Sequence, residues 1–567
     1  MIRQLDVDGV PTLLAPTAGP LRAGLTFRVG TADETLARSG VTHLLEHLAL
    51  APLGLADHHF NGATAPTFTS FYMQGSEEDI AGFLNTVCRT IHDLPMARLE
   101  VEKEILRTEW SGRGNPTIGD IPLWRHGARD HGLSSYAEFG LNALTEQDLR
   151  WWAAQWFTRE NAALWIAGDR VPAGLRLALP SGVRRPVPAA SSALPRTPAY
   201  FVNGSRAVVL DAVVRRRTAA SVYAGVLERE LYRTLRQEDG VSYAINTGYQ
   251  PRGDGHATLR ALADALPEKQ DALLGGFVDV LAKLRVGRIE QADLDAAVAK
   301  REDGLASAEV DADRLPGCAL NLLTGEPNLT VDQLRAELKA VTLADLHEVN
   351  QEVTASALLM VPEGHSADWA GFVEAPTRST HAVTGTAYRE REGNAEIRVG
   401  VDGVSFVGPG GPLTVRYAEC AAVLAWPDGA RRLIGDDAIS VHIEPTLFDL
   451  HPGAIGVIDQ QIPADRRVPM PARPAERIPQ PYAGGNRPRP AQGAAPVKRA
   501  GWEIPLMVVS GLATLGMGGI SLLLTLGMLL AEESDPDDGW LWGMVVVGWL
   551  LTVILALPIV LLRRRRR

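Results

Sequence analysis

The stretch "GVTHLLEHLAL" at residues 40–50 sets two histidines and a glutamate into an otherwise apolar helical pattern. On a helix, positions i, i+3 and i+4 share one face, so His43, Glu46 and His47 form one stripe. Two neutral imidazoles four residues apart can bind one metal ion, and they suit zinc. Glu46 lies beside them, where it can take a proton from a metal-bound water. The alternative is a buried core helix that carries polar residues.

A zinc site of this kind needs a third protein ligand, and "LEVEKEILRTEW" at residues 99–110 offers two carboxylates. Glu102 and Glu109 are seven residues apart, which places them two turns along one face of a helix. A pair of inward carboxylates near a bound cation is one interpretation of this spacing. The ordinary alternative is an acidic helix face in contact with water.

Strand-like and helix-like segments alternate along the first part of the chain, in residues 1–190 and again in residues 195–375. The second segment closes with "SALLMVPEG", which echoes "NAALWIAGD" near the end of the first. This weak internal repeat predicts two α+β units, in each of which the strands form a sheet and the helices cover one face.

A different pattern follows the repeat. Residues 390–460 show short alternating strands broken by glycine-rich turns, which predicts a small all-β domain, faintly similar to a pleckstrin-homology-like barrel, with a helix near 446–450. No residue in it indicates chemistry, so a binding or spacer role is expected. Residues 461–500 hold nine prolines, and eight Lys or Arg against two acids, which predicts an extended linker with weak attraction to an anionic membrane.

Two long runs near the C-terminus, residues 504–531 and 540–562, contain no charged side chain. Each run is long enough to cross a bilayer, so we expect two transmembrane helices. The loop between them is acidic, and Lys or Arg flank their outer ends. The positive-inside rule then places both ends in the cytoplasm, with the N-terminal region facing the cytosol at the plasma membrane.

Composition narrows the class of protein further. The net charge of −11 gives no general reason to bind nucleic acid. The three cysteines, Cys88, Cys318 and Cys420, lie far apart in the sequence, which argues against a disulfide framework and fits a reducing compartment. The N-terminus shows no signal-peptide pattern, which agrees with a cytosolic location.

The HxxEH pattern is the inverse of the commoner HExxH and is typical of inverted zincins. Over about residues 1–375 the sequence resembles the insulinase, pitrilysin and mitochondrial processing peptidase family. Four stretches match in order: "VDGVPTLLAP", "VGTADE", "SGVTHLLEH" and "VEKEILRTE". The resemblance implies two duplicated α+β metallopeptidase domains and one zinc ion per chain.

The resemblance also assigns roles to individual residues. It makes His43, His47 and Glu109 the zinc ligands and Glu46 the general base. Glu102 becomes the carboxylate that orients a ligand.

A further match lies in the second unit, where "LRQEDGVSY" resembles the arginine–tyrosine motif of the family. It implies that Arg236 and Tyr243 hold the peptide and the developing oxyanion across a closed chamber. Because family chambers use four such domains and this chain supplies two, we expect a homodimer or a pairing with a related subunit.

The sequence also departs from the family pattern. Glu109 follows His47 by 62 residues, a shorter separation than is usual in the family. The family strand that pairs with the substrate backbone carries Asn-Ala-x-Thr. We expect this strand at Thr64, Ala65 and Thr67, where threonine replaces asparagine and Pro66 lacks an N–H. These changes bear on substrate binding more than on zinc.

Together, these features predict a membrane-anchored zinc endopeptidase that hydrolyses peptides or unfolded polypeptides on the cytosolic side. The alternative is a non-catalytic relative that serves as a peptide-binding scaffold or a membrane-proximal assembly subunit. Such relatives usually lose metal ligands, whereas every implied ligand is present here.

Overall fold

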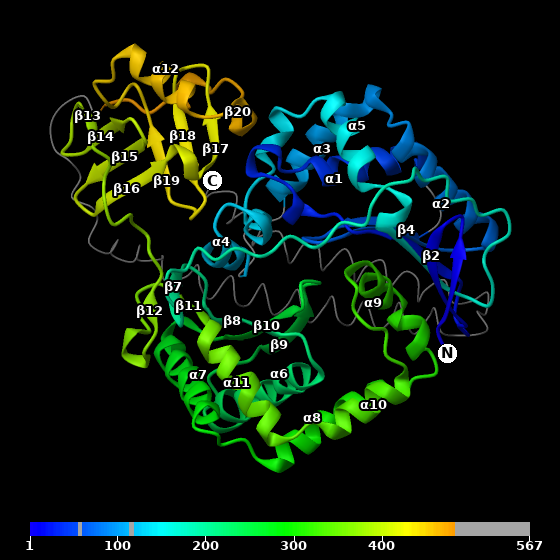
Figure 1. Ribbon diagram of the computed structural model, residues 1–567. Helices are drawn as coiled ribbons and strands as arrows, with labels where there is room; N and C mark the ends of the chain where they lie inside the picture. Colours follow the sequence, from blue (N-terminus) through cyan, green and yellow to red (C-terminus); the bar gives the residue numbers. More distant parts are fainter. Residues whose placement is uncertain (55–58, 113–117, 482–567) are drawn as a thin grey trace, which may run out of the picture. The chain divides into compact units, whose positions relative to one another are not determined.

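The computed structural model describes residues 1–54, 59–112 and 118–481 (Figure 1). Within these residues, no helix is both long enough and apolar enough to cross a membrane. The two predicted transmembrane segments, 504–531 and 540–562, lie outside the described residues, as does the second part of the predicted linker, residues 482–500.

The first sheet has six strands in the order β1-β2-β6-β3-β5-β4. Strands β2 and β6 run parallel, and the other neighbours pair antiparallel. Every residue of β6 is buried, as expected for a central strand with an apolar sequence. Strand β4 ends the order and is an edge strand. The strands are β1 Arg3–Val7, β2 Val10–Ala15, β3 Arg22–Phe27, β4 His59–Thr64, β5 Thr69–Gln74 and β6 Ala162–Ala167.

Helices α1, α2, α3 and α5 share one apolar core with this sheet. Helices α2 and α5 each begin at a capping box, in which the hydroxyl of Ser76 or Thr145 accepts the N–H three residues further on. Leucines of α1 pack inward against the phenylalanines of β3 and β5, which fixes the direction in which α1 presents its polar side. The helices are α1 Val41–Leu50, α2 Glu77–His92, α3 Leu99–Gly112 and α5 Glu146–Trp156.

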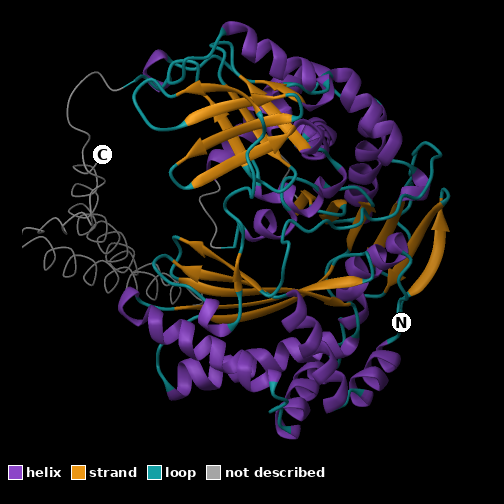
Figure 2. Cartoon of the chain, turned by 60° about the vertical axis from the view of Figure 1, so that its left-hand side comes forward, coloured by secondary structure: helices purple, strands orange, loops and turns teal. Residues whose placement is uncertain are grey.

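The second sheet also has six strands, in the order β12-β7-β11-β8-β10-β9, and helices α6, α7 and α11 share its main core (Figure 2). Its strands are β7 Ala199–Asn203, β8 Ala207–Arg215, β9 Ile245–Pro251, β10 His256–Asp264, β11 Leu358–Pro362 and β12 Val373–Glu374. Its helices are α6 Thr218–Leu231, α7 Gln270–Arg285, α8 Gln291–Gly304, α10 Val331–Ala340 and α11 Leu343–Ser356.

The two units have corresponding connectivity. Helix α6 follows β8 as α1 follows β3, and β9 is the edge strand of the second sheet as β4 is of the first. Helices α2 and α3 have counterparts in α7 and α8, which also follow a hairpin. The prediction of α+β architecture with a repeat is therefore confirmed at the level of the sheets.

Each unit contributes one helix to the other, which the sequence did not predict. Helix α9 (Val310–Thr324) packs Leu315 against side chains of β2 and β6 in the first sheet. Helix α4 (Ile121–His126) packs on the second sheet, where Trp124 stacks on Phe201. The face of the first sheet that α9 covers and the face of the second sheet that α4 covers are both apolar. Without these helices, that apolar surface would be exposed to water. The expectation that helices cover one face of each sheet is therefore wrong.

The third unit contains two four-stranded sheets, ordered β13-β14-β15-β16 and β19-β18-β17-β20. Helix α12 (Pro452–Gln461) packs Ile458 into the core that both sheets share. We call this the β unit. Its strands are β13 Gly385–Arg389, β14 Glu396–Gly400, β15 Gly403–Gly408, β16 Gly411–Arg416, β17 Cys420–Ala425, β18 Arg431–Gly435, β19 Ser440–Ile443 and β20 Arg467–Pro469.

The structure corrects three expectations for this region. The β unit is not all-β, because α12 belongs to it, and this helix lies later than the expected 446–450. The β unit also extends past residue 460 into the predicted linker. There β20 pairs with β17 and buries Val468, and Arg473 forms ion pairs with Asp428 and Glu444. Residues 467–473 therefore belong to the β unit, because Val468 is buried in it and Arg473 is ion-paired to it.

Candidate metal centre

Helix α1 begins with its first N–H groups bound by a buried carboxylate. The side chain of Glu34 accepts hydrogen bonds from the backbone N–H of Gly40 and of Thr42, each at 2.8 Å. Burial raises the pKa of the Glu34 carboxyl to about 8. These bonds satisfy N–H groups that have no partner within the helix and fix where α1 starts. The histidines of α1 are therefore held on a well-anchored element.

Helix α3 brings Glu109 opposite the two histidines of α1. The Glu109 carboxylate oxygens lie 3.9 Å from Nε2 of His43 and 3.6 Å from Nε2 of His47. One ligand atom from each of the three residues lies within 4.8 Å of the other two. Two ligands of a tetrahedral zinc are about 3.4 Å apart, so the three groups fit a zinc ion after small side-chain movements. Among the described residues, these two histidines and one glutamate have the geometry to hold a metal ion.

Each histidine is oriented from behind by a second carboxylate. Nδ1 of His47 lies 3.4 Å from Glu102, which in turn accepts two hydrogen bonds from Arg98 at 2.8 and 2.6 Å. Nδ1 of His43 lies 2.8 Å from Glu138. Both Nδ1 atoms are thus occupied and both Nε2 atoms face Glu109, which is the arrangement typical of zinc-binding histidines. The donor set therefore fits zinc on its chemistry as well as its spacing.

The sequence predicted Glu102 in this role but missed Glu138. Glu138 lies in the irregular segment between two short 3-10 helices, η5 (Asp130–Ser135) and η6 (Phe139–Asn142). No helical or strand periodicity links that segment to α1, and a lone glutamate in a loop carries no signal of its own.

Glu46 is buried beside the metal ligands, with 5 % of its surface exposed. One carboxylate oxygen accepts a 2.7 Å hydrogen bond from the hydroxyl of Thr64 on β4. Burial raises the pKa of Glu46 above its ordinary value, while His43 and the Thr64 hydrogen bond act in the opposite direction. A carboxylate with a raised pKa holds an abstracted proton more firmly, as a general base requires.

The structure corrects the placement of the predicted substrate strand. Ala65 and Thr67 lie in the turn between β4 and β5, where the N–H of Ala65 binds the carbonyl of Phe68 at 2.8 Å. Only Thr64 belongs to the edge strand. That strand contains Asn61-Gly62-Ala63-Thr64, so the expected Asn-x-x-Thr pattern occurs three residues earlier, with glycine for alanine. Pro66 terminates the strand and does not interrupt it.

Arg236 and Tyr243 form a separate cluster in the second unit. Arg236 lies in η8 (Tyr232–Glu238), and its guanidinium stacks over the rings of Tyr232 and Tyr243 at 5.0 and 5.1 Å from their centroids. The Tyr243 side chain is 82 % exposed. The pair is available at the surface, and its predicted approach to a zinc site in a partner protomer stays a prediction.

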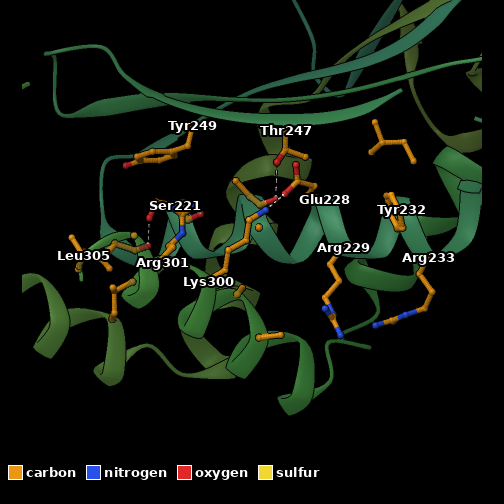
Figure 3. Close-up of a pocket in the computed structure, with 18 of the residues that line it drawn as sticks. Ser221, Glu228, Arg229, Tyr232, Arg233, Thr247, Tyr249, Lys300, Arg301 and Leu305 are labelled. Atoms are coloured by element: carbon orange, nitrogen blue, oxygen red, sulfur yellow. Dashed lines mark hydrogen bonds and ion pairs between the residues drawn. The ribbon is translucent and has the colours of Figure 1, made fainter. Parts of the chain in front are cut away.

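The second unit has a cavity of about 1070 Å³, bounded by α6, β9 and α8, at the place that corresponds to the candidate metal ligands of the first unit (Figure 3). Helix α8 corresponds to α3, yet it presents Lys300 and Arg301 to this cavity. Lys300 pairs with Glu228 of α6 at 3.1 Å, and Arg301 donates a hydrogen bond to the carbonyl of Ser221. Cationic side chains at this place repel a metal cation, so the second copy is unsuited to the chemistry of the first.

No family model matches the chain, and no curated protein matches its sequence. Solved structures do match its fold. A protease from Helicobacter pylori superimposes with a TM-score of 0.54 at 16% identity, over 64% of this chain and 99% of that chain. The first half of the periplasmic protease PqqL from Escherichia coli gives 0.53 at 14%, over 65% and 93%. A peptidase M16 inactive domain from Pseudomonas fluorescens gives 0.53 at 14%, over 64% and 98%.

The fold is that of the M16 peptidases. Because these identities are low, the likeness establishes the fold alone, and because one of the matching domains is inactive, the fold by itself does not establish catalysis.

Proposed function

We propose that the protein is a zinc-dependent peptidase that hydrolyses peptides or unfolded polypeptides. The observation that carries this proposal is the convergence of His43, His47 and Glu109, with Glu46 buried next to them. An acidic helix face in water would not place Glu109 against two histidines whose Nδ1 atoms are already bound by other carboxylates.

In the proposed mechanism, His43, His47 and Glu109 would hold a zinc ion, which when bound would lower the pKa of a water molecule and polarise the scissile carbonyl. Glu46 accepts the water proton on the carboxylate oxygen that Thr64 does not bind and delivers it to the leaving amine. The open edge of β4 pairs with the extended peptide backbone beside this carboxylate. Arg236 and Tyr243 contact the peptide and the oxyanion from a partner protomer.

The remaining parts of the proposal rest on sequence. Two C-terminal helices anchor the chain in the plasma membrane, and the peptidase region and the C-terminus face the cytoplasm. A homodimer or a related partner subunit completes the chamber around the substrate.

The second candidate is a non-catalytic, peptide-binding scaffold, which the likeness to an inactive M16 domain favours. The complete ligand set and the buried Glu46 distinguish this chain from the scaffold expectation, because a scaffold does not need an oriented metal site.

Zinc content and peptide hydrolysis by Glu46→Gln together test the proposal. We expect this variant to keep its zinc and to lose about 10²- to 10⁴-fold in kcat/KM on a mixed peptide pool, because the general base is gone. Glu104→Gln, an exposed change on α3, serves as the matched control and keeps both properties. A zinc-loaded wild type that cleaves no peptide would favour the scaffold.

A further inference from the structure

The β unit packs against the first unit at residues 127–142, which we call the 127–142 segment. Strand β20 contacts η6 of this segment, whereas strand β17 contacts η2 (Leu36–Arg38), which lies just before α1 in the sequence. Side chains from both units form one buried apolar cluster: Leu36, Ala37, Leu133, Tyr136, Leu424 and Ile434 are among its members. The contact is therefore packed like a core, and it includes residues of η2, which precedes α1 in the sequence.

Backbone atoms take part in the same contact. The N–H of Ala128 donates a 3.0 Å hydrogen bond to the carbonyl of Asp436, which lies just after β18. Gly127 has a φ of +77°, and a Cβ at this position would lie 1.9 Å from the same carbonyl oxygen. The two backbone segments thus approach so closely that only glycine fits at position 127. This contact sets the register of the 127–142 segment against the β unit.

The 127–142 segment carries Glu138, whose carboxylate binds Nδ1 of His43 at 2.8 Å. Two residues later, a Cβ on Gly140 would lie 2.5 Å from the backbone of Arg38 and Ser39, directly before α1. The segment therefore lies between the β unit on one side and the start of the metal-binding helix on the other.

A second line of contacts leads to the helix that carries Glu109. The side-chain amide of Asn142 lies 3.6 Å from the sulfur of Met470, which follows β20. The amide oxygen of Asn142 accepts a 3.0 Å hydrogen bond from Arg107, two residues before Glu109 on α3. Both helices that supply zinc ligands are thus in contact with residues that the β unit holds.

We propose that the β unit is a positioning element of the metal centre: it holds the 127–142 segment so that Glu138 fixes the ring of His43. This inference rests on the proposed zinc site. The segment consists of short 3-10 turns and irregular chain, and its backbone hydrogen bonds are local, such as that from the N–H of Tyr136 to the carbonyl of Leu133 at 3.0 Å. Packing against β17 and β20 supplies the order that a second carboxylate needs to orient a metal ligand.

The test uses the full chain with Leu424→Ala, which removes buried contact at this interface. Ile397→Ala is the matched control, because it truncates an equally buried aliphatic side chain in the shared core of the β unit. Zinc affinity is measured by chelator competition, and the visible spectrum of the cobalt-loaded protein reports ligand geometry. Glu138→Gln and the Glu138→Gln/Leu424→Ala double variant complete a cycle.

We expect Glu138→Gln to weaken zinc binding about 10- to 100-fold. Leu424→Ala should weaken it about three- to tenfold and change the cobalt spectrum, whereas Ile397→Ala changes neither. In the Glu138→Gln background, Leu424→Ala should cause no further loss, because its effect passes through Glu138. Equal effects of the two alanine variants, or an additive double variant, would overturn the proposal.

Hydrogen exchange separates this proposal from the proposed function. Leu424→Ala should raise exchange in residues 127–142 and in the first turn of α1, and Ile397→Ala should not. This readout needs no metal. A wild type without zinc affinity overturns the proposed function, whereas unchanged exchange in α1 overturns the coupling.

Discussion

Gly62 faces the Glu46 carboxylate across the gap between β4 and α1. A Cβ at position 62 would lie 2.3 Å from Oε1 of Glu46, the oxygen that Thr64 leaves free. The glycine on the edge strand therefore leaves room for the carboxylate of Glu46, the proposed general base. Its counterpart strand β9 carries Gly248, around which a Cβ would meet nothing within 4 Å.

We expect Gly62→Ala to lower kcat/KM by at least tenfold, because Glu46 must swing away and small misplacements of a reacting group are costly. Zinc content should change little, since the three clashing atoms, Cγ, Cδ and Oε1, all belong to Glu46 and none to a candidate metal ligand. Gly248→Ala is the control. Steady-state kinetics check this, and equal activity of Gly62→Ala and wild type would contradict the placement of Glu46.

His131 makes folding sensitive to acid. Burial, together with the neighbouring positive charge of Arg252 and His126, lowers the pKa of His131 to about 4. The unfolded chain binds a proton at this residue near pH 6.5, whereas the folded chain does so only near pH 4. Stability is therefore present above pH 6.5 and is lost as the pH falls toward 4.

We expect the free energy of unfolding to fall by up to about 1.4 kcal/mol per pH unit over this window because of His131. His131→Gln removes the titration and should flatten the dependence between pH 6.5 and 4. Denaturant titrations of both proteins at several pH values measure it. Parallel curves for the two proteins would show that His131 titrates normally in the fold.

Among the secondary-structure elements, the sequence predicted the helices that the spacing of their polar side chains identifies. The i, i+3, i+4 spacing of His43, Glu46 and His47 located α1, and the seven-residue spacing of Glu102 and Glu109 located α3. The edge strand was misplaced because the family pattern was matched to residues 64–67, whereas the hydrogen-bond ladder with β5 places the strand at His59–Thr64.

Helix α9 shows what sequence pattern does not reveal. Its apolar face is that of an ordinary amphipathic helix. The residues of this face do not indicate that the sheet they cover belongs to the other unit. The partner of an apolar face is set by topology, which is not local. The same holds for Glu138, whose role depends on a contact 95 residues away along the chain.

We expect Leu315→Ala on α9 to cost about 2–5 kcal/mol of unfolding free energy, as for other buried leucines. Because Leu315 packs on the first sheet, hydrogen exchange should increase in β2 and β6 of the other unit. Val286→Ala, at an exposed position, should cost less than about 0.5 kcal/mol. Faster hydrogen exchange confined to the second unit would contradict the packing of α9 on the first sheet.

At the scale of the whole molecule, two units with one strand order have opposite electrostatic character at corresponding places. The first presents His43, His47 and Glu109, and the second presents Lys300 and Arg301. In the second sheet, the buried carboxylate of Asp211 accepts a hydrogen bond from Nε of Arg125 on α4, and the backbone carbonyl of Asp211 accepts another from the same guanidinium. This buried ion pair joins the two units in addition to their apolar packing.

Metal analysis of the purified full chain decides whether His43, His47 and Glu109 hold zinc. After dialysis against metal-free buffer, we expect one zinc per chain in the wild type and much less in Glu109→Ala, with Glu104→Ala as the control on the same helix. A wild type that retains no zinc, or a Glu109→Ala variant that retains as much as the wild type, would contradict it.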